Sequence, residues 1–212
     1  MLNIFIINGG QIFGTSNGLL NKKLAEITAN FMSSNGFNVR TSDINYEYDE
    51  LVELENFLWA DITIWHVPIW WFQLPHRLKE YMDVVFKNGE GRLYESDGRT
   101  RTKPQLNYGR GGLLHSKKYL ITTSWNAPKG AFTIKGEIMD QTSVDDGVLF
   151  GFHRAMEFLG LSRLKGFHFY DVLKNMDKER FEEYENQYIE HLNRTLKKEI
   201  LLVSNPIDGK NT

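Results

Sequence analysis

The stretch from Asp61 to Phe72 reads Asp-Ile-Thr-Ile-Trp-His-Val-Pro-Ile-Trp-Trp-Phe. Its first half is an apolar run, typical of a strand that is covered on both faces in a parallel sheet. Just past Pro68 the chain reaches three consecutive aromatic residues. In an open α/β sheet, ligands bind outside the carboxyl ends of the strands. The stretch therefore predicts a buried strand that ends in an aromatic platform for a flat ligand.

On both sides of this strand, further apolar runs alternate with helical patterns. Strands are expected at 2–8, 37–43, 61–67, 118–124 and 165–171. Between and after them, apolar residues recur three and four positions apart, which is typical of helices packed on a sheet. This alternation predicts the α/β class, a doubly wound five-stranded parallel sheet with helices on both faces. We expect the flavodoxin-like strand order 2-1-3-4-5.

One stretch interrupts the alternation. Residues 87–117 are rich in Gly, Arg, Asp and Asn and show little periodicity. Long irregular segments inside a compact domain are often functional, so we expect an insertion at the ligand edge of the sheet. The rest of 1–202 forms a single domain in this interpretation. The polar residues 203–212 are expected to be a disordered tail.

Composition excludes several functional classes. The 212 residues include no cysteine, which rules out disulfides, thiolate metal sites and a Cys nucleophile. A formal net charge of −2 does not favour a nucleic-acid partner. No apolar run approaches the roughly 18 to 20 residues of a membrane span. The N-terminus has no basic region before its apolar run, so we expect no signal peptide and a cytoplasmic protein.

Three predicted loops carry the chemistry. The first contains Ser16, Asn17 and Gly18 ahead of a helical pattern, and a helix start of this kind favours a phosphate. An ordinary N-cap is the alternative. The other two loops, 68–73 and 124–128, bring Trp70, Trp71 and a further Trp-Asn-Ala-Pro string. In the predicted order the three loops converge, and together they fit a phosphorylated flat ring such as a flavin. A partner interface is the alternative for the tryptophans.

The chemistry in this interpretation belongs to the cofactor. No side chain is expected to act as nucleophile or acid–base catalyst, and backbone N–H groups or Asn126 would stabilise charge on the reduced ring. The six histidines show no metal-ligand spacing, so no metal site is expected. His66 lies on the central strand, where a hydrogen-bonded core histidine is expected.

Several strings in order resemble the modulator of drug activity B family, bacterial NAD(P)H:quinone oxidoreductases related to DT-diaphorase. These strings are 16–18, 57–61, 68–71, 93–101, 108–113 and 125–128, and the resemblance spans residues 2 to about 195. It implies a flavodoxin-like homodimer that binds FAD, takes hydride from NAD(P)H, with NADPH favoured, and reduces a quinone. Each transfer would move two electrons in a ping-pong sequence through flavin N5.

The resemblance also implies the cofactor site. The pyrophosphate end of FAD would lie at Ser16, Asn17, Gly18, Leu19, Leu20, Asn21, Lys22 and Lys23. The isoalloxazine would be lined by Pro68, Ile69, Trp70, Trp71 and Phe72, and its edge contacted by Ser124, Trp125, Asn126 and Ala127. Tyr108 would reach the flavin from the partner subunit, and Tyr108 and Trp71 would line the acceptor site.

Two other functions use the same fold. A flavodoxin-type carrier of single electrons is usually markedly acidic, which the charge of −2 does not match. A response-regulator-like phosphate module needs an acidic cluster at the strand ends, but the first predicted strand ends in Asn8-Gly9-Gly10. The sequence therefore favours the reductase.

Overall fold

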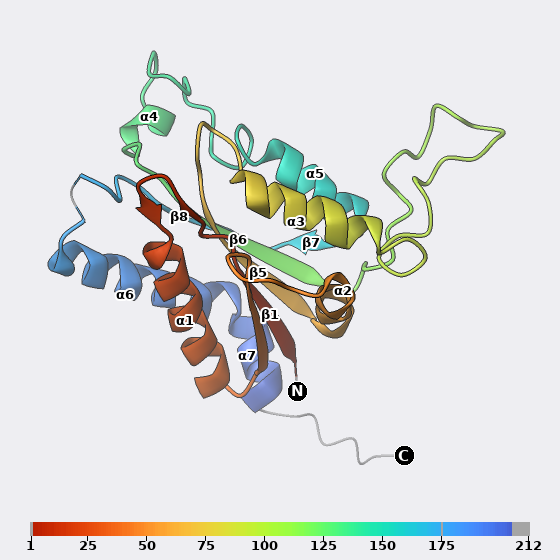
Figure 1. Ribbon diagram of the computed structural model, residues 1–212, viewed down its shortest axis with the longest axis horizontal. Helices are drawn as coiled ribbons and strands as arrows, with labels where there is room; N and C mark the ends of the chain where they lie inside the picture. The colour runs from red at the N-terminus through yellow and green to blue at the C-terminus, as the bar shows by residue number, and fades with distance from the viewer. Residues whose placement is uncertain (1, 175, 205–212) are drawn as a thin grey trace.

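A parallel sheet organises the computed structural model, which describes residues 2–174 and 176–204, without the side chains of 202–204. The strands lie in the order β4-β1-β5-β6-β7, with β8 also paired to β6 (Figure 1). They are β1 (Asn3–Asn8), β4 (Asn38–Asp43), β5 (Ile62–Pro68), β6 (Lys118–Ser124), β7 (Ser162–Arg163) and β8 (Phe167–Phe169). All pairs in this sheet are parallel. The predicted flavodoxin-like order 2-1-3-4-5 is confirmed, with β7 and β8 sharing the fifth position.

Helices cover both faces of the sheet (Figure 1). They are α1 (Leu19–Ser34), α2 (Glu50–Trp59), α3 (His76–Lys87), α4 (Gly130–Thr133), α5 (Phe150–Phe158), α6 (Lys178–Thr195) and α7 (Lys197–Ser204). One apolar cluster joins the sheet to α1, α6 and α7, and a second joins it to α2, α3 and α5. The sheet is therefore the middle layer of three, as the apolar strands predict.

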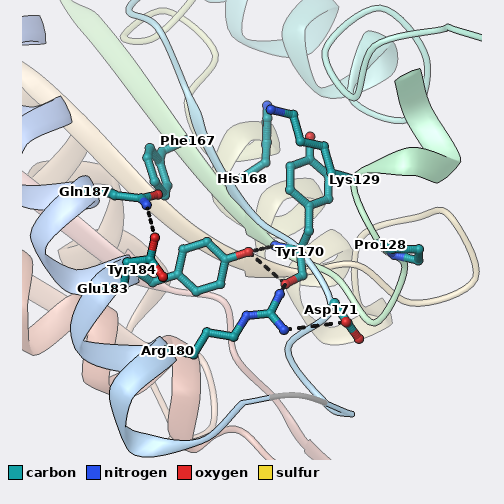
Figure 2. Close-up of a pocket in the computed structure, with 10 residues that line it drawn as sticks. All are labelled: Pro128, Lys129, Phe167, His168, Tyr170, Asp171, Arg180, Glu183, Tyr184 and Gln187. Atoms are coloured by element: carbon teal, nitrogen blue, oxygen red, sulfur yellow. Dashed lines mark hydrogen bonds and ion pairs between the residues drawn. The ribbon is translucent and has the colours of Figure 1, made fainter. Parts of the chain in front are cut away.

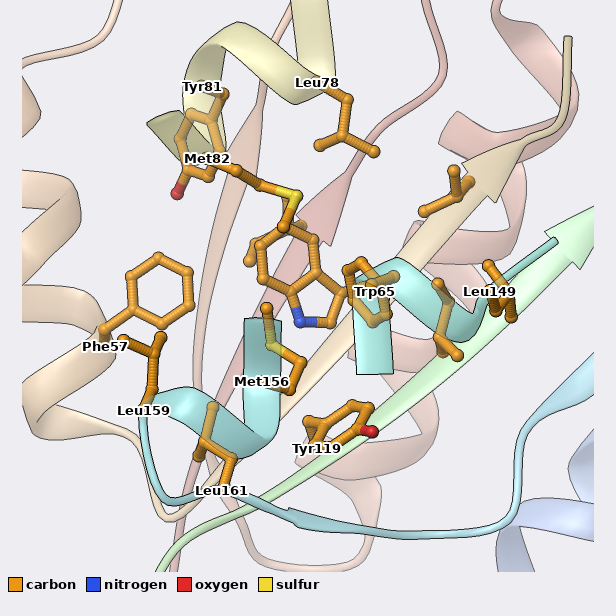
Figure 3. Close-up of a cluster of buried hydrophobic side chains, with 14 of the residues drawn as sticks. Phe57, Trp65, Leu78, Tyr81, Met82, Tyr119, Leu149, Met156, Leu159 and Leu161 are labelled. Carbon is orange, nitrogen blue, oxygen red and sulfur yellow. The ribbon is translucent and has the colours of Figure 1, made fainter. Parts of the chain in front are cut away.

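Alternation along the strands divides the core between these two clusters. Ile4 and Ile6 of β1 belong to the α1 side, whereas Phe5 and Ile7 belong to the α3 side. Successive side chains of a strand point to opposite faces, so a fully apolar strand feeds both layers. Trp65 of β5 is fully buried and lies at the centre of the α3-side cluster (Figure 3).

The edge of the sheet departs from the prediction of one strand at 165–171. The chain pairs with β6 twice, through β7 and then β8, and leaves it between them. A Cβ atom on Gly166 would lie 2.7 Å from the Ile121 carbonyl oxygen. This close backbone approach explains why the strand is interrupted at a glycine.

Smaller differences concern element ends. The helical pattern that follows the last predicted strand forms two helices, α6 and α7, which meet at Leu196. Helix α7 continues to Ser204, two residues past the expected boundary of the tail, and 205–212 lie outside the described residues. A hairpin of β2 (Ile12–Phe13) and β3 (Ser16–Asn17), and the short α4, were not predicted. Two-residue strands and one-turn helices are too short to leave a periodic signal.

The insertion lies at the other edge of the sheet from the one predicted. It leaves the end of α3 at Lys87 and enters the start of β6 at Lys118, so it joins the amino ends of the strands. Leu114 N–H donates to the carbonyl of Leu159, just past the end of α5. Figure 1 shows the insertion on the far side of the molecule from β2, β3 and α4. Within one chain, residues 87–117 are therefore remote from the loops at the carboxyl ends.

Candidate cofactor site

The first loop depends on two glycines that follow β1. A Cβ atom on Gly9 would lie 2.8 Å from Leu78 Cδ2, and one on Gly10 would lie 2.8 Å from Asn21 Cβ. Neither space admits a side chain, so the loop can pass between β5 and α1 only with glycine at both positions. The Gly9 N–H also donates to the His66 carbonyl at 2.8 Å, which fixes the loop to β5.

The start of α1 is open to solvent. Its N-cap is Gly18, with a positive φ of 69° and no side chain to cap the helix. The Asn17 side chain accepts from the Leu19 N–H at 3.2 Å, and Ser16 Oγ accepts from the Gly18 N–H at 3.4 Å and donates to the Gln11 carbonyl. Gly18, and neither Ser16 nor Asn17, is therefore the N-cap residue, while Asn17 binds the first N–H group of the helix. Backbone N–H groups at such a start can bind an anion, and the exposed Lys22 and Lys23 add positive charge nearby.

The first and fourth loops are joined directly. Asn21 Nδ2 donates to Ser124 Oγ at 3.1 Å, and both side chains are buried. These two predicted cofactor residues are 103 positions apart in the sequence. Their bond shows that the loops meet as the strand order predicts, and it makes both residues supports of the site floor. Neither side chain is on the exposed surface.

The third loop is a tight turn that displays its aromatic residues. Trp70 and Gln73 exchange two backbone hydrogen bonds, at 3.0 and 2.9 Å. Between them Trp71 and Phe72 have positive φ angles of 49° and 60°. This is the conformation of a two-residue hairpin turn, which usually holds Asn and Gly. The Trp71 side chain is 94% exposed, so the turn holds a large apolar ring in solvent.

Aromatic rings from the first and third loops form one surface. Phe13 of the β2–β3 hairpin lies 5.8 Å from the Trp70 ring and 5.1 Å from the His76 ring. Phe13 and Trp71 are both mostly exposed, and Phe72 is partly exposed. Exposed apolar patches of this kind mark binding surfaces. Phe13 was not among the predicted site residues, because the residues around it form no periodic strand pattern.

The fourth loop is anchored beneath this surface. The Trp125 indole is 4% exposed, lies 4.7 Å from the Phe132 ring and 6.4 Å from the Phe72 ring. Its Nε1 donates to Thr123 Oγ1 at 2.7 Å. Asn126 and Pro128 are exposed, whereas Ala127 is half-buried. Of the predicted residues 124–127, Asn126 is therefore the one whose side chain is open to a ligand, and Trp125 supports it.

Tyr108 lies apart from these loops within the chain. It is 70% exposed, and its ring lies 6.0 Å from the Phe158 ring at the end of α5. The Arg99 guanidinium lies 5.5 Å from the centre of its ring. Both contacts belong to the amino edge of the sheet. The structure therefore does not bring Tyr108 to the other predicted site residues of its own chain.

The prediction that His66 is a core histidine is confirmed. Its side chain is fully buried, with Nε2 3.0 Å from Thr28 Oγ1 and Nδ1 2.8 Å from Thr122 Oγ1. Burial lowers the pKa of His66 to about 3, because the protonated ring would lose its hydration. His66 is therefore neutral at ordinary pH and joins α1, β5 and β6 beneath the site.

A cavity of about 440 Å³ lies beside the fourth loop (Figure 2). It is lined by Pro128, Lys129, Phe167, His168, Tyr170, Asp171, Arg180, Glu183, Tyr184 and Gln187. Arg180 donates to the Tyr170 carbonyl at 3.2 Å and lies 3.5 Å from Asp171. These residues come from three separate segments, so no local motif could have identified the cavity. Among the described residues, no group of three or more His, Asp or Glu side chains could hold a metal ion.

No helix in the described part of the chain is long and apolar enough to cross a membrane.

Comparison with known proteins gives consistent results. A family described by its flavodoxin-like fold matches residues 3–192. The chain is 42% identical over 194 residues to the protein named NADPH:quinone oxidoreductase MdaB of Haemophilus influenzae, and the match covers 91% of this chain and 98% of the relative.

Two solved structures share the fold at lower identity. One is described as a quinone reductase of Klebsiella pneumoniae, with a TM-score of 0.70 and 19% identity over 91% of this chain and 84% of that one. Another is general stress protein 14 of Treponema denticola in complex with FMN. It has a TM-score of 0.62 and 16% identity over 92% of this chain and 98% of that one.

Proposed function

Because the chain belongs to the modulator of drug activity B family, with a flavodoxin-like fold, we propose that it is a flavin-dependent NADPH:quinone oxidoreductase. The observation that carries this proposal is the nearly full-length match at 42% identity to a protein of that name. The convergence of the first, third and fourth loops on one edge of the sheet is consistent with it. When bound, a flavin would accept hydride from the reduced nicotinamide and pass it to the quinone.

The residues present fit such a cofactor. The start of α1, whose N-cap is a glycine, offers backbone N–H groups to a phosphate. The exposed rings of Trp71 and Phe72, with the half-buried ring of Trp70, offer apolar contact to a flat ring system. A flavin would cover the apolar surface that the third loop leaves in solvent. Asn126 and the N–H groups of the fourth loop would hold the polar edge of the ring.

Within the proposal the cofactor is FAD. Lys22 and Lys23 are exposed in the first two turns of α1, where they extend the positive charge beyond the place of a single phosphate. Two cations and a helix start match a diphosphate better than the monophosphate of FMN. Release of the cofactor from purified protein and its chromatography against both standards tests this point. Release of FMN alone would contradict it.

The protein's own contribution to catalysis is orientation. Nicotinamide and quinone would occupy the same face of the ring in turn, next to Trp71, in a ping-pong sequence of two-electron transfers. Holding each substrate parallel to the cofactor would raise the rate of hydride transfer, because it fixes the distance and angle of that transfer. The buried Asn21–Ser124 bond and the Gly9–His66 bond keep the floor of the site rigid.

A homodimer completes the site in this proposal. Tyr108 is mostly exposed and lies at the amino edge of the sheet, remote from the third and fourth loops of its own chain. It would reach the acceptor position only from a second copy. A contact of this kind would give each active site residues from two chains, as isologous dimers allow.

One absorption experiment tests the central claim. Purified protein, as isolated or after incubation with FAD, should show flavin bands that NADPH bleaches and a quinone restores. A protein that remains colourless with FAD, and oxidises no NADPH in the presence of a quinone, would contradict the proposed function. Bleaching without quinone turnover would instead favour a flavodoxin-type electron carrier.

Mixed dimers test the placement of Tyr108. Tyr108→Ala and Trp71→Ala are each expected to lower quinone turnover. If Tyr108 acts in the partner's site, a heterodimer of the two variants contains one intact site and one with both changes. Statistical mixing should then restore about a quarter of the normal sites. If each Tyr108 serves its own chain, mixing restores no intact site and turnover stays at the mean of the two variants.

A further inference from the structure

A carboxylate lies between two histidines at the edge of the sheet, outside the residues assigned to the cofactor. Asp145 Oδ1 is 2.9 Å from His153 Nε2, and its Oδ2 is 3.9 Å from His168 Nε2. His153 is buried, and the His168 side chain is 16% exposed. Asp145 belongs to the irregular segment between α4 and α5, and it also lies 3.9 Å from the Arg163 guanidinium of β7.

The partners fix which ring nitrogens carry hydrogen. His168 Nε2 faces the carboxylate and therefore carries the hydrogen, which leaves Nδ1 as an acceptor. The Thr123 hydroxyl is 2.7 Å from His168 Nδ1 and donates to it. The Thr123 oxygen in turn accepts the Trp125 Nε1–H, at 2.7 Å. Every hydrogen on this path, from Trp125 through Thr123 and His168, points towards Asp145.

A second series of hydrogen bonds reaches Asp145 through His153. The Tyr119 hydroxyl is 2.8 Å from His153 Nδ1, and burial raises the pKa of Tyr119, so the hydroxyl stays protonated and donates. His153 Nε2–H then donates to Asp145. The hydrogen bond from His153, together with the nearby His168 ring, holds the pKa of Asp145 well below its usual range. The carboxylate is therefore ionised whenever the protein is folded at ordinary pH.

The path through His168 and Thr123 ends at Trp125, in the floor of the candidate cofactor site. Trp125 opens the fourth loop, and its indole lies 6.4 Å from the ring of Phe72 in the third-loop turn. The Trp125 N–H donates to the Phe169 carbonyl at 2.8 Å, so the backbone is held by β8. The rotation of the indole is set by packing against Phe132 and Phe72 and by its hydrogen bond to Thr123. A chain of polarised hydrogen bonds can orient a group more firmly than its last bond alone.

We propose that Asp145 is a positioning residue, which acts through His168 and Thr123 to orient Trp125 and thereby the third and fourth loops around the cofactor. It touches neither cofactor nor substrate. His168 also lines the cavity of Figure 2, so solvent reaches this path beside the fourth loop. The link to the cofactor rests on the proposed function, whereas the orientation of Trp125 does not.

The orientation can be measured without cofactor. The five tryptophans give five indole N–H resonances in ¹⁵N-labelled protein, and Trp125→Phe identifies the one from Trp125. Thr123→Val removes the acceptor and should shift that resonance upfield. Asp145→Asn should shift it in the same direction, because the neutral amide no longer polarises the path through His168.

Two variants serve as controls. Asp146→Asn makes the same charge change one position away, at a carboxylate that accepts from Ser143 Oγ and contacts neither histidine. Tyr119→Phe removes the hydrogen bond to His153 Nδ1 and leaves the path through His168 intact. Neither variant should move the Trp125 indole resonance. An indole resonance that Asp145→Asn leaves in place, while Thr123→Val moves it, would overturn the proposal.

The effect on the site is measured by FAD titration. Asp145→Asn should weaken FAD binding roughly three- to tenfold, the usual effect of losing one ordinary hydrogen bond. His168→Asn retains an acceptor for Thr123 but does not reach Asp145. It should therefore weaken FAD binding less than His168→Gln does. Adding Asp145→Asn to His168→Asn should have no further effect, because the path is already cut.

The outcomes separate the two proposals. An indole shift without any change in FAD affinity or quinone turnover would overturn the positioning role. Additive effects of Asp145→Asn and His168→Asn would also overturn it, because the carboxylate would then act by another route. If the unaltered protein binds no flavin, the proposed function is wrong, and the positioning role in cofactor binding falls with it, whatever the indole resonance shows.

Discussion

Strand β5 and the turn that follows it carry tryptophans with opposite environments. Trp65 is fully buried among Phe57, Tyr81 and Phe152, with ring centres 5.4 to 6.3 Å away. Six residues later Trp71 is 94% exposed. The strand is extended and paired on both sides, whereas the turn reverses the chain with positive φ angles at two bulky residues.

The difference separates folding from binding. A buried aromatic ring stabilises the fold through the area that it removes from water. An exposed ring on a turn of unfavourable φ does not stabilise the free protein, and such local strain is concentrated at functional sites. Changes in β5 should therefore lower the free energy of unfolding, and changes in the turn should affect binding.

The largest effect is expected at the centre of the core. Trp65→Ala should lower the free energy of unfolding by about 3–5 kcal/mol, because it leaves a cavity among rigid neighbours. Trp65→Phe should have a smaller effect, since the buried Trp65 Nε1 has no hydrogen-bond partner in the structure. Guanidinium unfolding followed by circular dichroism measures both. Equal stability of Trp65→Ala and the unaltered protein would contradict the division between strand and turn.

Acid should destabilise the folded protein through His66, which lies on strand β5. Its pKa is about 3 in the folded protein and 6.5 in an ordinary environment, so the unfolded chain binds a proton first. The contribution is fully present above pH 6.5 and is lost as the pH falls towards 3, a loss of a few kcal/mol. Free energies of unfolding at several pH values between 7 and 4 measure this loss. In His66→Gln the dependence of the free energy of unfolding on pH should be weaker by this amount. An unchanged dependence on pH would exclude His66 as the source of the loss.

The turn should become more stable when its strain is removed. Trp71→Asn combined with Phe72→Gly installs the residues that its φ angles favour. The free energy of unfolding should rise by about 1 kcal/mol, while flavin affinity falls because the exposed rings are gone. Thermal unfolding and flavin titration of the same sample test both parts. A double variant that loses stability would show that the turn is not strained.

The smallest change in stability is expected for the exposed ring alone. Trp71→Ala should alter the free energy of unfolding by less than about 0.5 kcal/mol. It should weaken flavin binding or quinone turnover roughly three- to tenfold, the range of a lost aromatic contact. Trp70→Ala, which also loses the Phe13 contact, is the companion variant. Unchanged flavin content and quinone kinetics in both variants would refute the assignment of the third loop.

Much of the fold was predictable because its strands are covered on both faces. The runs at 2–8, 61–67 and 118–124 coincide with β1, β5 and β6 to within a residue or two. Short edge strands bury less and leave weaker signals, which is why the predicted strand at 165–171 contains β8 but not β7. The position of the insertion was wrong, since its composition indicates a loop but does not say which edge of the sheet it joins.

The loops of the candidate site could be predicted from the sequence, whereas the contacts between their side chains could not. Local patterns identified 16–18, 68–73 and 124–128 as loops at one edge, and the strand order brought them together. They could not indicate that Asn21 bonds to Ser124 or that the Trp125 indole is buried on Thr123. Phe13 and Asp145 were missed altogether, because each gains its role from residues far away in the sequence.

The sequence by itself determined the parallel sheet, its order and the edge at which the three loops meet, because strands buried on both faces form apolar runs between helical patterns. Only the tertiary structure decided which tryptophan is core and which is surface, where Tyr108 lies, and which carboxylate faces His168. These depend on distances between residues that are remote in the sequence. Hydrogen bonds and ring contacts act over a few ångströms, so only the folded chain determines which groups they join.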